Sequence, residues 1–98
     1  MIDHLVLFTL RDDVSREDAD DLVNSLRALR ESVPGVVDLS VGENFSERSG
    51  GYTHGLFVRL RTHEDLQGYM RHPDHLFVVE KLDERTTGRI VVDYEHDG

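Results

Sequence analysis

The sequence contains no cysteine and no tryptophan, and Lys81 is the only lysine among its 11 basic residues. Without cysteine the chain can form neither a disulfide nor a thiolate metal site, and a cytoplasmic location is expected. The 20 acidic residues give a formal net charge of -9. Because no basic stripe interrupts this acidic composition, neither nucleic acid nor an anionic membrane surface is an expected partner.

Long hydrophobic runs are also absent. The most apolar stretch, residues 2–10, is interrupted by Asp3 and His4 and has no basic leader, so neither a membrane span nor a signal peptide is predicted. The 98 residues starting at Met1 predict one complete domain over residues 1–98. A core of this size is thin, and without disulfides we expect oligomerisation to supplement it.

The apolar spacing predicts alternating strands and helices. Strands are expected at residues 2–10, 36–42, 52–60 and 89–94, and helices from Ser15 to the Pro34-Gly35 stop, after Thr62, and at 74–84. Ser15 and Thr62 are predicted N-caps, each with an aspartate three residues later. This order predicts a ferredoxin-like α+β fold, in which helices cover one face of an antiparallel sheet.

The predicted helices leave the second face of the sheet uncovered. The apolar residues expected there are Leu5, Leu7, Val36, Phe57 and Val91. Exposed apolar patches of this kind mark interfaces, and a second copy of the same sheet is the simplest cover. The sequence therefore predicts a face-to-face homodimer with two-fold symmetry.

Candidate chemistry gathers in the segment from Tyr69 to His75, which also contains His72. Pro73 disfavours helix at the residue before it, so Tyr69 and His75 are expected on either side of a helix break. His4 and His54 are predicted on the helix-facing side of two central strands, where they would be neighbours. No two of the six histidines have the i, i+4 spacing of a helical ligand pair, so no metal site is expected.

Each of these residues also has a purely structural interpretation. A histidine among apolar strand residues is more often a satisfied core residue, and a tyrosine on an apolar helix face is commonly a core aromatic. His72 fits a turn-stabilising or pocket-rim position. His63 and His96 are expected to face solvent.

Several motifs spread over the chain carry a family resemblance. They are residues 2–8 (IDHLVLF), 33–36 (VPGV), 41–44 (VGEN), 51–54 (GYTH), 69–75 (YMRHPDH) and 92–94 (VDY). On these motifs the chain resembles the stress-responsive dimeric α+β barrel (Dabb) family. The resemblance implies a dimeric barrel built from two ferredoxin-like sheets.

Among Dabb proteins, the chain is similar to the olivetolic acid cyclase-like members. That resemblance implies a reaction without a cofactor, in which His75 is the base and Tyr69 donates a hydrogen bond to a carbonyl. It also implies a substrate-binding floor formed by His4 and His54. The expected activity is an aldol-type closure, or a related lyase or isomerase reaction, on a polyketide-like or phenolic substrate.

Two positions depart from those members, because Leu26 and Thr86 stand where they have aromatic residues. Both departures favour a non-catalytic, stress-associated or ligand-binding protein, as would a cavity below roughly 300 Å³. A further alternative is an oxygenase that needs neither metal nor flavin. Assembly beyond the dimer is a third possibility.

Overall fold

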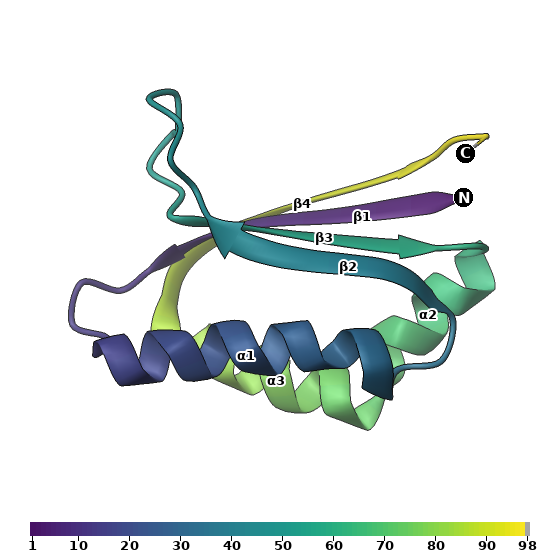
Figure 1. Ribbon diagram of the computed structural model, residues 1–98, viewed down its shortest axis with the longest axis horizontal. Coiled ribbons are helices and arrows are strands. Elements are labelled where there is room, and N and C mark those ends of the chain that lie inside the picture. Colours follow the sequence, from purple (N-terminus) through teal and green to yellow (C-terminus); the bar gives the residue numbers. More distant parts are fainter. Residues whose placement is uncertain (98) are drawn as a thin grey trace.

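The computed structural model describes residues 1–97, in which four strands and three helices follow one another along the chain (Figure 1). They are β1 (Ile2–Leu10), α1 (Arg16–Ser32), β2 (Val36–Glu43), β3 (His54–Leu60), α2 (His63–Arg71), α3 (Pro73–Arg85) and β4 (Thr86–Glu95). Gly98, the last residue of the predicted domain, lies outside the described residues.

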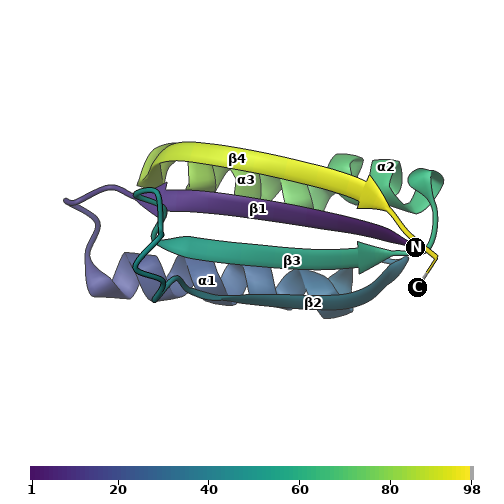
Figure 2. The same ribbon diagram turned by 90° about the horizontal axis from the view of Figure 1, so that it is seen from above.

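The strands form one antiparallel sheet in the order β2-β3-β1-β4. All three helices lie against the same face of this sheet, and its other face is uncovered (Figures 1 and 2). The predicted ferredoxin-like α+β fold is therefore confirmed.

Local capping explains where the helices begin. The Ser15 hydroxyl accepts a hydrogen bond from the backbone N–H of Asp18 at 3.1 Å, and Thr62 accepts one from Asp65 at the same distance. His72 ends α2 and also caps α3, because its ring nitrogen accepts the backbone N–H of Asp74. Pro73 begins α3, where its fixed φ and missing N–H are tolerated, so the break falls where the sequence predicts it.

Two strand boundaries differ from the predictions. β3 begins at His54 instead of residue 52, because the N–H of Tyr52 bonds back to the carbonyl of Ser49 within the preceding loop. β4 begins at Thr86 instead of residue 89, because it pairs with β1 as far as Leu10.

Two residues predicted on the uncovered face lie on the other side of the sheet. Val36 pairs with Leu60 and packs against the core, because the register of β2 shifts between Val36 and Asp38. Val91 pairs with the buried Val6, so it also faces the helices. The strand β4 is apolar on both sides, and its alternation alone did not reveal which side is covered.

The core lies between the sheet and the helices. It is formed by α1 residues Leu22, Leu26 and Leu29, together with apolar side chains of β1, β3, α2 and α3. Burial of each large aliphatic side chain contributes roughly 1.5–3 kcal/mol, which orients the helices on the sheet. Within residues 1–97, no helix combines the length and apolar character needed to cross a membrane.

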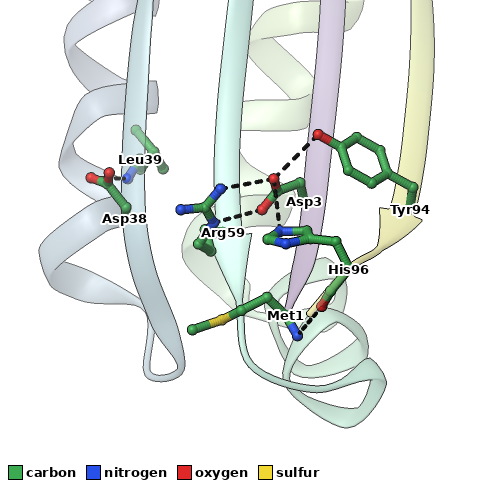
Figure 3. Close-up of polar contacts among 7 residues, drawn as sticks. All are labelled: Met1, Asp3, Asp38, Leu39, Arg59, Tyr94 and His96. Atoms are coloured by element: carbon green, nitrogen blue, oxygen red, sulfur yellow. Dashed lines mark hydrogen bonds and ion pairs between the residues drawn. The ribbon is translucent and has the colours of Figure 1, made fainter. Parts of the chain in front are cut away.

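The two chain ends are joined on the sheet. The backbone N–H of His96 donates to the carbonyl of Met1 at 2.9 Å, and the Met1 amino group donates to the His96 carbonyl at 3.0 Å. The ring of His96 is half-buried, with Nε2 3.0 Å from the Asp3 carboxylate (Figure 3). The prediction that His96 faces solvent was wrong, because the backbone pairing of His96 with Met1 beyond the end of β4 lays its ring over Asp3.

Candidate functional site

A cavity of about 210 Å³ lies between the sheet and helices α2 and α3. Its walls are mostly apolar, and they include Val6, Leu26, Leu56, Val78, Leu82 and Val91. Three rings bring polar atoms to these walls: His4 from β1, Tyr69 from α2 and His75 from α3. The helix break at Pro73 thus brings together the two residues that the sequence placed on either side of it.

Tyr69 is fully buried, and its hydroxyl has no hydrogen-bond partner among residues 1–97. A buried hydroxyl without a partner costs about 1–3 kcal/mol, so this group is available for a ligand atom. Burial raises the pKa of Tyr69 well above its usual range. The phenol therefore stays protonated near neutral pH and can donate a hydrogen bond.

His75 lies beside Tyr69, with the two ring centres 4.6 Å apart. Its Nδ1 is 3.1 Å from the backbone carbonyl of Met70. Because a carbonyl oxygen can only accept, Nδ1 carries the proton and Nε2 keeps its lone pair. Burial lowers the pKa of His75, although the Met70 carbonyl acts in the opposite direction, so the neutral, basic form is favoured.

His4 completes the group, with its ring centre 5.8 Å from that of Tyr69. Its Nδ1 makes a short contact with the carboxylate of Asp93 on the neighbouring strand β4. Since the carboxylate accepts, Nδ1 of His4 is the donor in this contact, which fixes the orientation of the ring.

Comparison with known proteins agrees with this architecture. The chain matches the family described as the stress responsive A/B barrel domain over residues 2–96. The chain belongs to this family. The family assignment rests on almost the whole described chain and confirms the resemblance seen in the sequence motifs.

Three relatives illustrate the family and the fold. The stress-response A/B barrel domain-containing protein DABB1 of Arabidopsis thaliana is 32% identical over 98 residues, which cover 96% of this chain and 46% of DABB1. A dimeric, ferredoxin-like protein of unknown function from Bacteroides fragilis is 30% identical, with a TM-score of 0.79 and coverage of 97% of this chain and 95% of that one. The hydroxynitrile lyase of Passiflora edulis has a TM-score of 0.89 at 16% identity, covers 99% and 94% of the two chains, and shows the fold alone.

The chain spans less than half the length of the curated A/B barrel relatives it matches. The activity and partners of those longer proteins therefore do not transfer to this chain directly.

In this A/B barrel domain, the predicted site residues divide into three groups. His4, Tyr69, His75 and Leu26 line the cavity. His72 and Thr86 do not: His72 caps α3, and the Thr86 hydroxyl donates to the Leu82 carbonyl at 2.6 Å.

His54 belongs to a different cavity. It lies on β3 on the helix-facing side, as predicted, but β1 and β3 are antiparallel, so His4 pairs with Val58 and His54 pairs with Phe8. The two positions are four steps apart along β1, or roughly 13 Å, so His4 and His54 are not neighbours. His54 stacks on Phe8 and borders a separate cavity of about 470 Å³ beside α1.

Two charged residues at the site were not predicted from the sequence: Asp93, which contacts His4, and Arg89, which lines the cavity. Asp93 was placed only as an alternating strand residue, and the signal that identifies it is its cross-strand position opposite His4. Arg89 lies at the cavity wall and pairs with Asp83 of α3. Within residues 1–97 no three histidine, aspartate or glutamate side chains are grouped as metal ligands.

Proposed function

We propose that this domain is an acid–base enzyme that acts on a small, mostly apolar carbonyl or phenolic compound. The observation that carries the proposal is the unpartnered hydroxyl of Tyr69 in an apolar cavity, next to the unprotonated Nε2 of His75. In this reaction Tyr69 donates a hydrogen bond to a carbonyl oxygen, and His75 takes a proton from the adjacent carbon.

The shifted pKa values of the pair support these roles. A raised pKa keeps Tyr69 protonated as the donor, and a lowered pKa keeps His75 neutral as the base. Their environments thus favour a donor and a base at the same pH, which is the arrangement that enolisation requires. His4, oriented by Asp93, is placed to bind a second polar atom of the substrate.

The cavity volume restricts the substrate. At about 210 Å³ it lies below the roughly 300–1,000 Å³ typical of ligand pockets. This volume favours a substrate smaller than a long polyketide chain. One protein of the same fold, from Passiflora edulis, is by its name a hydroxynitrile lyase.

Deuterium exchange at a ketone tests the proposal without the natural substrate. The domain would be incubated in D₂O with cyclohexanone or acetylacetone, and deuterium uptake at the carbon next to the carbonyl would be followed by NMR. We expect exchange at least about 100-fold faster with wild type than with His75→Ala, since a general base contributes roughly 10²–10⁴ in rate. His63→Ala, at an exposed histidine, is the matched control and should exchange like wild type.

The same small volume favours one alternative, a protein that binds a ligand without chemistry. Thermal shift with small β-diketones and alkyl phenols separates the two. A His75-dependent shift without any exchange above buffer would support binding alone and contradict the enzyme.

We also propose that the domain is a homodimer joined through the uncovered face of the sheet. Leu7, Ile90, Val92 and Tyr94 are 39–48% exposed there. The Bacteroides fragilis relative, at 30% identity, is dimeric. A single species of monomer mass in sedimentation at micromolar concentration would contradict the proposal.

A further inference from the structure

The segment between β2 and β3, residues 44–53, rises from the uncovered side of the sheet and away from the helices (Figure 1). We call this segment the arm. It lies at the end of the sheet where β2 finishes and β3 begins, so it extends past the apolar face formed by Leu7, Ile90 and Val92.

Hydrogen bonds fix the conformation of the arm. The backbone N–H of Asn44 donates to the carbonyl of Thr53 at 2.8 Å, and its side-chain amide donates to Tyr52 at 2.9 Å. The Asn44 side-chain oxygen accepts the N–H of Ser46 at 2.9 Å. Gly50 and Gly51 turn the chain back with positive φ angles of 63° and 88°, which non-glycine residues rarely adopt.

Phe45 lies between two of these hydrogen-bonded residues and is 99% exposed. Burial of a phenylalanine side chain contributes roughly 1.5–3 kcal/mol, and the chain itself forgoes this stabilisation. An ordered segment that holds an aromatic side chain in solvent is typical of a contact that a partner completes.

Charge favours a second copy of this chain as that partner. The chain carries a formal net charge of -9, so two copies repel each other over most of their surface. Within the arm, however, Glu47 and Arg48 balance each other. On the sheet face, Asp3 is held by Arg59 at 2.7 and 2.9 Å. The arm and the face are thus the surfaces that two acidic copies can bring together at least electrostatic cost.

We infer that Phe45 is an anchor residue of the homodimer: each arm reaches across the interface and packs its Phe45 against the partner. Two-fold symmetry makes both arms contribute at once, so the dimer gains two buried aromatic rings. This inference rests on the proposed homodimer and adds a residue that lies outside the sheet.

Sedimentation velocity over a concentration series tests the role of Phe45. We expect Phe45→Ser to raise the dimer Kd at least about tenfold, because burial of an anchor ring contributes more than 1 kcal/mol. Phe77→Ser is the matched control: Phe77 is 59% exposed on α3, in the helix layer, and its loss should leave Kd within about twofold of wild type. Circular dichroism and the melting curve establish that both variants fold.

A second variant uses the absence of tryptophan from the chain. In Phe45→Trp the new side chain is the only tryptophan, and its emission should shift to shorter wavelength as rising concentration forms the dimer. If wild type dimerises but Phe45→Ser has the wild-type Kd, or the Phe45→Trp emission does not move, the inference about the arm is overturned. If wild type itself is monomeric, the homodimer proposal fails and the inference fails with it.

Discussion

At the scale of single residues, the Tyr69 hydroxyl lowers the stability of the protein while it serves the proposed reaction. Its hydroxyl is buried without a partner, which destabilises the ligand-free protein, while its ring fills the core. Removal of the hydroxyl alone separates these two contributions.

We predict that Tyr69→Phe leaves the free energy of unfolding unchanged or raises it by up to about 1–3 kcal/mol, because an unsatisfied buried group is lost. The same variant should lose the ketone exchange expected of wild type. Urea unfolding at a fixed protein concentration measures the first effect. Tyr94→Phe is the control, since the Tyr94 hydroxyl donates to Asp3 at 3.3 Å and its loss should lower stability. Equal losses in both variants would mean that the Tyr69 hydroxyl has a partner after all.

The same residues show how far the sequence predicts the site. Local spacing and the family motifs placed Tyr69 and His75 around a proline, and a break between helices depends only on nearby residues. Asp93 was not predicted because it is 89 residues from His4 in the sequence. Their contact depends on the register of β4 against β1, which the whole sheet determines. For the same reason His54 could be assigned to a face but not to a cavity.

At the scale of elements, glycines at two places have opposite roles. Gly35 follows α1 with a φ of +89°, and a Cβ placed there would lie 3.1 Å from the Asp65 side chain. Gly68 lies inside α2, with nothing within 4 Å of such a Cβ. Gly35 is required by the turn between α1 and β2, whereas Gly68 only weakens helix α2.

We therefore predict that Gly68→Ala raises the free energy of unfolding by roughly 1 kcal/mol, the difference in helix propensity. Gly35→Ala should lower it by roughly 1–3 kcal/mol, because alanine is strained at positive φ and must displace Asp65. Thermal or urea unfolding of the two variants in parallel checks both signs. A gain in stability from Gly35→Ala would show that the turn can relax.

Helix starts, which depend on nearby residues, were predicted correctly, whereas the sheet face of some strand residues, which depends on distant parts of the chain, was not. The caps at Ser15 and Thr62 formed as expected, because a hydroxyl and an N–H three residues apart need no tertiary information. The predicted sheet faces of Val36 and Val91 were wrong. The face of Val36 depends on a register shift in β2, and that of Val91 depends on which side of β4 the helices cover.

At the scale of the whole molecule, one buried carboxylate joins the chain ends to the centre of the sheet. Asp3 on β1 receives the guanidinium of Arg59 on β3, the hydroxyl of Tyr94 on β4 and the ring of His96 beyond it (Figure 3). The hydrogen bonds from Arg59 hold the pKa of Asp3 well below its usual range, against the opposing effect of burial, and His96 adds to the lowering.

The sign of the resulting pH dependence follows from this lowered pKa. The folded protein keeps Asp3 ionised at a pH where the unfolded chain, with a pKa of about 3.9, already binds a proton. The contribution of Asp3 is therefore fully present above about pH 4 and is lost as the pH falls toward the folded-state pKa. We predict that Asp3→Asn lowers the melting temperature at pH 7, by roughly 4–8 °C, and that its difference from wild type shrinks at pH 3.

Melting curves at both pH values and one protein concentration measure this, since a dimer makes the midpoint depend on concentration. Asp12→Asn is the control, because Asp12 is exposed and has no ion pair among residues 1–97, so its loss should have little effect at either pH. If the Asp3→Asn deficit were the same at pH 3 as at pH 7, the network would act through packing and not through the charge of Asp3. A shrinking deficit would instead show that the ion pair on the uncovered face helps to hold β1, β3 and β4 in register.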